Sequence, residues 1–257
     1  MKSLYALLLL SLAIQAIAQP SSPQQQTLDR VAFEQRIGQP LPAVQFLNAR
    51  NENIELARLA ERKPLILALS WFNCPHLCPM LLDRLAESAG ALPFAPGDYR
   101  VAVVSIDPRE TPAQAAALLR RLRRRHGPVV DQWQLLTGNP AAIDKLAQAV
   151  GFHYAYDAAR DSYAHPAGLV VVASGGPISR YLLRLEPSQP DLRLALVDAG
   201  QGRLGSPVDQ LLLRCYHFDP QNGRYSFAAV RLLQIAGGLF VLALVALVVG
   251  LRRREQA

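Results

Sequence analysis

The chain has 257 residues, of which 51% are hydrophobic, and it carries a formal net charge of +7 at pH 7. Two apolar segments at the ends raise the hydrophobic fraction, and the roughly 200 residues between them suffice for one domain with a core. Without the charges of the terminal segments (Lys2, Arg231, and three Arg and one Glu in the tail) the net charge falls to +3. That is too small to indicate a nucleic acid partner.

The first 18 residues have the pattern of a secretory signal peptide. Lys2 precedes an apolar run at residues 4–17, and Ala16-Ile17-Ala18 provides an Ala-x-Ala cleavage site. An uncleaved anchor helix is the alternative, but the run is shorter than the ~20 residues that a bilayer span needs. Residues 19–37, which begin with a Ser/Pro/Gln stretch, are expected to form a linker and lead-in segment.

Residues 38–200 are expected to form one α/β domain. Alternating apolar residues predict a hairpin made of strands at residues 43–47 and 53–56. The continuous apolar run at residues 65–70 is typical of a central strand that is buried on both of its faces.

Two cysteines follow that central strand directly, in the sequence Trp71-Phe72-Asn73-Cys74-Pro75-His76-Leu77-Cys78-Pro79. Pro79 fits the first position of a helix, which predicts Cys78 as the N-cap. Unpaired N–H groups and the helix dipole favour a thiolate there. Cys74 and Cys78 are therefore candidate nucleophiles or soft metal ligands, although a structural disulfide between them is also possible.

The rest of the domain alternates strands and helices. A helix is expected after the cysteine segment, and a second buried strand is expected at residues 99–106. Together with the strand at residues 65–70 they form a parallel strand-helix-strand crossover. Thr111 and Pro112 have the chemistry of a helix start. The further elements predicted from periodicity are a helix at residues 112–126, a strand at 133–136, a helix at 140–150 and a hairpin of strands at 168–173 and 178–183, with Gly175-Gly176 at its turn.

The C-terminal part contains a predicted transmembrane helix at residues 229–251. Its last twenty residues carry no charge, which is enough to cross a bilayer, and the alternative of a buried core helix fits that length less well. Arg252-Arg253-Arg254 follow at once, so the tail at residues 252–257 is expected in the cytoplasm and the main domain on the outer face. Residues 201–228, with a third thiol at Cys215, form the membrane-proximal segment.

Three motifs occur in a characteristic order: the cysteine segment just quoted, Ser105-Ile106-Asp107-Pro108-Arg109-Glu110-Thr111-Pro112, and His165 followed by the last hairpin. Over residues 38–190 this arrangement resembles the SCO/SenC copper-binding proteins of cytochrome c oxidase assembly. The resemblance implies a thioredoxin-like fold with a central mixed sheet. It also implies that Cys74, Cys78 and His165 bind one copper ion, as Cu(I) or Cu(II).

The function that the resemblance implies is that of a copper chaperone without turnover. The expected partners are subunit II of cytochrome c oxidase, whose binuclear site receives the copper, and an upstream copper donor or thiol reductant. The expected location is the cytoplasmic membrane of a bacterium, with the domain on the periplasmic or outer face. Soft thiolates select Cu(I), and an added imidazole also accommodates Cu(II). A structural zinc site would normally have a fourth protein ligand.

The sequence is also compatible with other functions. A thiol-disulfide oxidoreductase that reduces the cysteines of the oxidase copper site would use Cys74 and Cys78 as its redox pair and would not need His165. A peroxidase on the same fold is a third possibility. His76 could tune the site or be a solvated loop residue, and Cys215 could be a plain buried cysteine or take part in copper transfer.

Overall fold

The computed structural model describes residues 31–74, 77–95 and 97–204, and beyond these only Phe218–Asp219, Arg224–Tyr225 and Gly237. Of Leu77, Cys78 and the residues at 218–219 and 224–225, only the backbone is described. The expected signal peptide, Cys215, the tail and nearly all of the expected membrane span lie outside these residues. Among the residues that are described, no helix is both long enough and apolar enough to cross a membrane.

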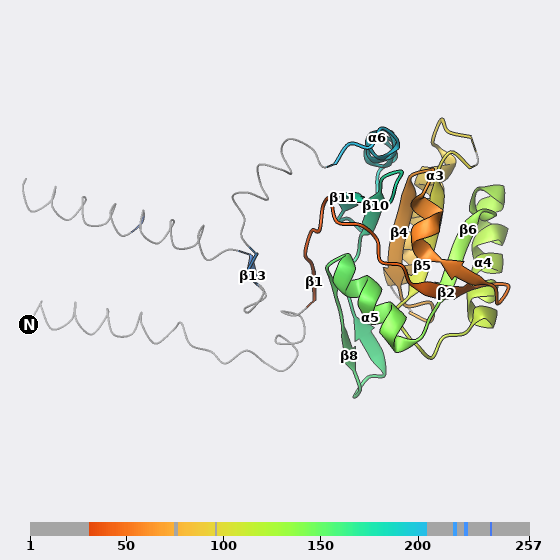
Figure 1. Ribbon diagram of the computed structural model, residues 1–257. Coiled ribbons are helices and arrows are strands. Elements are labelled where there is room, and N and C mark those ends of the chain that lie inside the picture. Colours follow the sequence, from red (N-terminus) through yellow and green to blue (C-terminus); the bar gives the residue numbers. More distant parts are fainter. Residues whose placement is uncertain are drawn as a thin grey trace, which may run out of the picture.

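A seven-stranded mixed sheet forms the centre of the domain, in the order β11-β10-β4-β5-β6-β2-β3 (Figure 1). The central strands β4, β5 and β6 are parallel to one another, and the remaining neighbours pair antiparallel. The strand bounds are β2 Gln45–Asn48, β3 Asn53–Glu55, β4 Leu65–Ser70, β5 Arg100–Ser105, β6 Trp133–Thr137, β10 Leu169–Val172 and β11 Ile178–Leu182. The predicted α/β class and mixed sheet are confirmed, and the arrangement is consistent with a thioredoxin-like fold.

Alternation along β4 divides the core into two layers. Leu65, Leu67 and Leu69 pack on one face of the sheet, and Ile66 and Ala68 pack on the other. Every residue of β4 is buried, as predicted for a strand that is covered on both sides. The first face is covered by α5 (Pro140–Ala149) and the 3-10 helix η1 (Leu56–Ala60), and the second by α3 (Leu77–Gly90), α4 (Pro112–His126) and α6 (Gln189–Gly200).

The helix starts follow local capping chemistry. Thr111 caps α4 with a full capping box, in which its side chain accepts from the N–H of Gln114 and the Gln114 side chain accepts from the N–H of Thr111. Asn139 and Ser188 cap α5 and α6 more simply, because the side-chain oxygen of each accepts from one backbone N–H in the first turn. The α4 and α5 predictions are confirmed, and Gly175 and Gly176 adopt the positive φ angles that a tight turn between β10 and β11 requires.

Three features differ from the sequence prediction. Helix α3 begins at Leu77, so Cys78 lies inside the first turn and the prediction that Cys78 is the N-cap was wrong. Pro79 is tolerated there because the first N–H groups of a helix have no partner within the helix. Helix α6 and six short strands in the described residues were not predicted. The strands form three pairs: β1 (Ala32–Phe33) with β7 (Phe152–His153), β8 (Ala155–Asp157) with β9 (Ser162–Ala164), and β12 (Phe218–Asp219) with β13 (Arg224–Tyr225).

Candidate metal site

The sheet brings three chain segments to one edge. Strands β4 and β5 are parallel and in register up to Ser70 and Ser105, so the segments that follow them leave the sheet at the same end. Strand β10 runs antiparallel to β4, with Val170 opposite Leu67, so the residues that precede β10 arrive at that end too. The cysteine loop (residues 71–76), the β5–α4 loop (residues 106–111) and His165 therefore share this edge.

The described part of the cysteine loop, residues 71–74, forms a tight turn. The N–H of Cys74 donates to the carbonyl oxygen of Trp71 at 3.1 Å, and Cys74 itself is half-buried. Cys78 follows in the first turn of α3, where the helix dipole still favours a thiolate. The two predicted thiols thus belong to one turn and one helix start, and the side chain of Cys78 lies outside the described part.

A buried carboxylate holds the backbone of this loop. Glu110, which is 5% exposed, accepts from the N–H of Phe72 at 3.1 Å and from the N–H of Asn73 at 2.8 Å. The hydroxyl of Ser105 donates to the same carboxylate at 2.5 Å. Burial raises the pKa of Glu110, although these hydrogen bonds favour its charged form. Glu110 was part of the motif recognised in the sequence, but this contact was not predicted.

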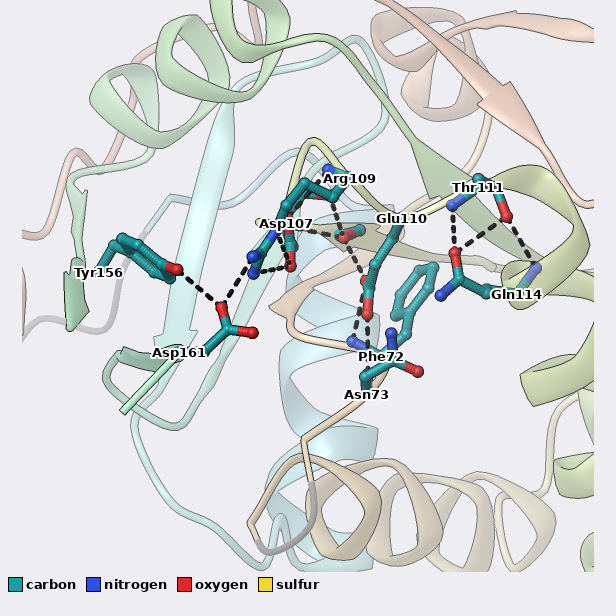
Figure 2. Close-up of polar contacts among 10 residues, drawn as sticks. Phe72, Asn73, Asp107, Arg109, Glu110, Thr111, Gln114, Tyr156 and Asp161 are labelled. Carbon is teal, nitrogen blue, oxygen red and sulfur yellow. Dashed lines mark hydrogen bonds and ion pairs between the residues drawn. The ribbon is translucent and has the colours of Figure 1, made fainter. Parts of the chain in front are cut away.

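An ionic network lies on the other side of the β5–α4 loop. Arg109 binds both oxygens of the buried Asp107 side chain, through Nε at 2.8 Å and Nη2 at 2.7 Å. Its Nη1 donates to Asp161 at 2.7 Å, and the hydroxyl of Tyr156 donates to the same oxygen of Asp161 at 2.7 Å (Figure 2). Burial alone would raise the pKa of Asp107, but the hydrogen bonds and charge of Arg109 outweigh it and lower that pKa.

Asp161 belongs to the β8–β9 hairpin (residues 155–164), and His165 follows this hairpin directly. His165 is half-buried, and its ring lies 6.0 Å from that of Phe152. Nδ1 lies 3.0 Å from the carbonyl oxygen of Pro166. A carbonyl only accepts hydrogen bonds, so Nδ1 carries the hydrogen, and a neutral imidazole then has its basic lone pair on Nε2. Metal-binding histidines are commonly oriented in this manner.

The hairpin also touches the cysteine loop through aromatic rings. Trp71 and Tyr163 meet edge to face, with centroids 5.8 Å apart. Tyr163 lies two residues before His165, so this contact joins the histidine-bearing segment to the cysteine loop. Within the described side chains, which exclude that of Cys78, no group of three His, Cys, Asp or Glu residues has the geometry to hold a metal. The segments of the three predicted ligands thus lie at one edge of the sheet, but the described side chains do not form a three-ligand metal site.

The fold and this edge define a class of protein: a mixed α/β domain of thioredoxin-like architecture that presents a CxxxC pair at a helix start, beside a histidine that directly follows a hairpin. The comparison with known families is more specific. The family described as SCO1/SenC matches residues 39–193, which is more than half of the chain, and the protein belongs to that family. The resemblance noted in the sequence is thereby confirmed.

Solved structures agree on the fold. A protein from Aquifex aeolicus VF5 is 20% identical, with a TM-score of 0.57 over 65% of this chain and 95% of its own. ScoI from Arabidopsis thaliana, solved with copper bound, is 17% identical, with a TM-score of 0.52 over 63% and 98%. BsSco, a Sco family member in which a disulfide switch was identified, is 18% identical, with a TM-score of 0.53 over 66% and 98%. The comparison with curated proteins finds no match.

Proposed function

We propose that the protein binds one copper ion through Cys74, Cys78 and His165 and delivers it to the binuclear copper site of cytochrome c oxidase subunit II. The observation that carries the proposal is that His165 and the cysteine loop lie at the same edge of the sheet. The Nδ1 atom of His165 faces a carbonyl oxygen there, which leaves Nε2 for the metal. Membership of the SCO1/SenC family supports it. So do a copper-bound ScoI and the description of BsSco's family as cytochrome c oxidase assembly proteins.

The donor set suits copper in both oxidation states. Two thiolates are soft ligands that favour Cu(I), and an imidazole adds a ligand that Cu(II) accepts. Both cysteines come from one short segment, whereas His165 comes from a separate segment that directly follows the β8–β9 hairpin. The cysteine segment alone can therefore hold Cu(I), whereas Cu(II) also requires the imidazole of His165.

Delivery would proceed by ligand exchange at this exposed edge. Thiolates and imidazoles of subunit II replace Cys74, Cys78 and His165 one at a time, so the ion never enters water as a free species. An upstream copper donor, or a reductant that keeps both thiols reduced, is required before each delivery, because only the thiolate binds the metal.

A second candidate function uses the same two thiols. As a thiol-disulfide reductase, one thiolate of Cys74 and Cys78 attacks a disulfide in subunit II and forms a mixed disulfide. The other thiolate then attacks the sulfur of the first cysteine in this mixed disulfide and displaces the subunit II sulfur still bound there, so the pair is oxidised by two electrons as the target gains two. The close spacing of the cysteines favours this reaction, and a disulfide switch is described for BsSco.

Copper titration of the full-length protein tests the first candidate. The reduced protein, purified in detergent, is titrated anaerobically with Cu(I) and separately with Cu(II), and the loaded form is mixed with metal-free subunit II. We expect one copper per chain, a sulfur-to-copper charge-transfer band in the Cu(II) form, and transfer to subunit II. His165→Ala is expected to weaken Cu(II) binding by about 10-fold or more and to reduce that band.

Two control variants sharpen this result. His153→Ala removes a histidine of β7 that interacts with Glu34, and it should bind copper like the wild type. Cys215→Ser shows whether the third thiol contributes. Absence of a stable copper complex in the wild type, together with rapid reduction of oxidised subunit II, would replace the chaperone with the reductase.

A further inference from the structure

The β5–α4 loop contacts both segments that carry the proposed ligands. On one side Glu110 receives the backbone N–H groups of Phe72 and Asn73, directly before Cys74. On the other side Arg109 donates to Asp161, four residues before His165 (Figure 2). Two neighbouring residues of one loop thus hold the cysteine loop and the β8–β9 hairpin.

The loop itself is fixed at both of its ends. It follows the buried strand β5, and Thr111 begins helix α4 with a capping box in which the N–H of Thr111 donates to Gln114 at 2.7 Å. Between these ends Asp107 accepts from Arg109 through both of its oxygens, and its side chain is only 4% exposed. A bidentate contact to a buried carboxylate gives the guanidinium one orientation, and in that orientation Nη1 points to Asp161.

The hairpin has little support of its own. Strands β8 and β9 have three residues each and form a separate two-stranded sheet, which is marginally stable without further contacts. The ring contact of Trp71 with Tyr163 and the side-chain interaction of Tyr163 with Asp107 hold strand β9 near the core, and the ion pair of Arg109 with Asp161 holds the turn of the hairpin. The guanidinium of Arg109 also lies over the ring of Tyr156, at 5.3 Å from its centroid.

We propose that Arg109, held by Asp107, sets the position of His165 relative to the two thiols and thereby sets how strongly the protein prefers Cu(II) over Cu(I). The inference rests on the proposed copper site and adds a positioning residue to it. Loss of the contact between Arg109 and Asp161 lets the hairpin move, so the imidazole is no longer presented to the metal. The thiolates stay in place, because Glu110 continues to hold the cysteine loop.

The test compares Arg109→Gln with Arg160→Gln in the full-length protein. Arg160 forms an ion pair with Asp157 at 2.7 Å, and both of these residues lie within the hairpin. The two variants therefore lose the same charge near the same site, but only Arg109→Gln cuts the ion pair between the β5–α4 loop and the hairpin. Asp161→Asn is a third variant, which removes the charge at the hairpin end and leaves Asp107 and Arg109 paired. Asn tolerates the positive φ of 44° at that position.

We expect Arg109→Gln and Asp161→Asn to weaken Cu(II) binding by about 10-fold and to change Cu(I) binding by less than about 3-fold. The Cu(II) spectrum should move towards that of His165→Ala. In the metal-free protein, amide hydrogen exchange at residues 155–164 should become faster in these two variants. Arg160→Gln should leave the copper affinities and the spectrum unchanged.

Two results separate the inference from the function on which it rests. A wild-type protein that binds no copper would overturn the proposed function. If amide hydrogen exchange in the hairpin were also unchanged in metal-free Arg109→Gln, the inference would be overturned separately. A wild type that binds copper, with Arg109→Gln indistinguishable from Arg160→Gln, would overturn the positioning role alone. Equal weakening of Cu(I) and Cu(II) in Arg109→Gln would also contradict it, because that pattern indicates general damage.

Discussion

At the scale of single residues, Glu110 is the side chain on which the cysteine loop depends. Its carboxylate receives two backbone N–H groups of the loop and the hydroxyl of Ser105, and it is almost completely buried. A buried acceptor with three donors leaves all three unsatisfied if it is removed. The loop is therefore stabilised by one side chain that lies far from it in the sequence.

Replacing Glu110 by Gln tests this dependence. The amide has the same shape, but its NH₂ group must face one of the three donors, so at least one hydrogen bond is lost. We expect the free energy of unfolding to fall by about 1–3 kcal/mol, measured by urea denaturation. Glu87→Gln, at an exposed residue paired with Arg84 in α3, should change it by less than about 0.5 kcal/mol. Equal effects of the two substitutions would contradict the role of Glu110.

The roles of individual residues were only partly predictable from the sequence. Cys74, Cys78 and His165 could be named because reactive residue types occur there in a recognisable order. Glu110 stood in the same motif, but two of its three partners are backbone N–H groups, which every residue except proline has and which leave no trace in the sequence. Which N–H groups meet a carboxylate depends on how β4 and β5 pair, and that is a property of the fold.

At the scale of elements, the β5–α4 loop and the β8–β9 hairpin are joined by charge, and this makes their contact sensitive to acid. The pKa of Asp107 in the folded protein lies below its ordinary value of 3.8, despite burial, because of Arg109. A carboxyl whose pKa is lowered by folding contributes its stabilisation above the unfolded pKa and loses it as the pH falls through the folded value. The contact should therefore persist at neutral pH and weaken in acid.

Thermal unfolding of the wild type and of Arg109→Gln between pH 7 and pH 2.5 checks this prediction. The wild type is expected to have the higher midpoint at pH 7, and the difference should shrink below about pH 4, where Asp107 of the unfolded chain begins to bind protons while Asp107 of the folded protein does not. Arg120→Gln, at an exposed arginine of α4 for which the described residues provide no ion pair, should show no such trend. A wild-type advantage that stays constant down to pH 2.5 would refute the explanation.

Sequence periodicity predicted the larger elements but not the smaller ones. β4, β5 and α4 were evident because long apolar runs and the chemistry of Thr111 and Pro112 point to one structure. β1 and β7–β9 have two or three residues each, too few for a period of two to be recognised. Helix α6 begins with Pro190 in its first turn, within a stretch of Ser, Gln and Pro that resembles a loop.

At the scale of the whole molecule, the segments outside the domain bear on how the domain is placed in the cell. We propose that residues 229–251 anchor it in the cytoplasmic membrane, with the sheet edge of Cys74 on the outer face and Arg252-Arg253-Arg254 inside. The support is the length of the apolar run and the positive-inside rule. Tethering would confine the cysteine loop to the plane of a membrane-bound acceptor.

Thiol labelling of intact cells tests this orientation. All three cysteines lie in the part that we place outside, so a membrane-impermeant maleimide should label the reduced protein in spheroplasts before lysis. The full-length chain should also resist alkaline extraction from membranes, and deletion of residues 229–257 should release it. Labelling that appears only after lysis would reverse the orientation, and extraction of the full-length chain would remove the anchor.

The antiparallel placement of β10 beside β4 has a consequence for the order in which the chain folds. Synthesis proceeds from the N-terminus, so both cysteines emerge while β5, α4, β6, α5 and the β8–β9 hairpin are still to follow. His165 reaches the cysteine loop only after a long loop has closed, which is slow and entropically unfavourable until the sheet forms. An unfinished chain offers two thiols without an imidazole. Capture of copper by all three residues would then mark a molecule whose folding is complete.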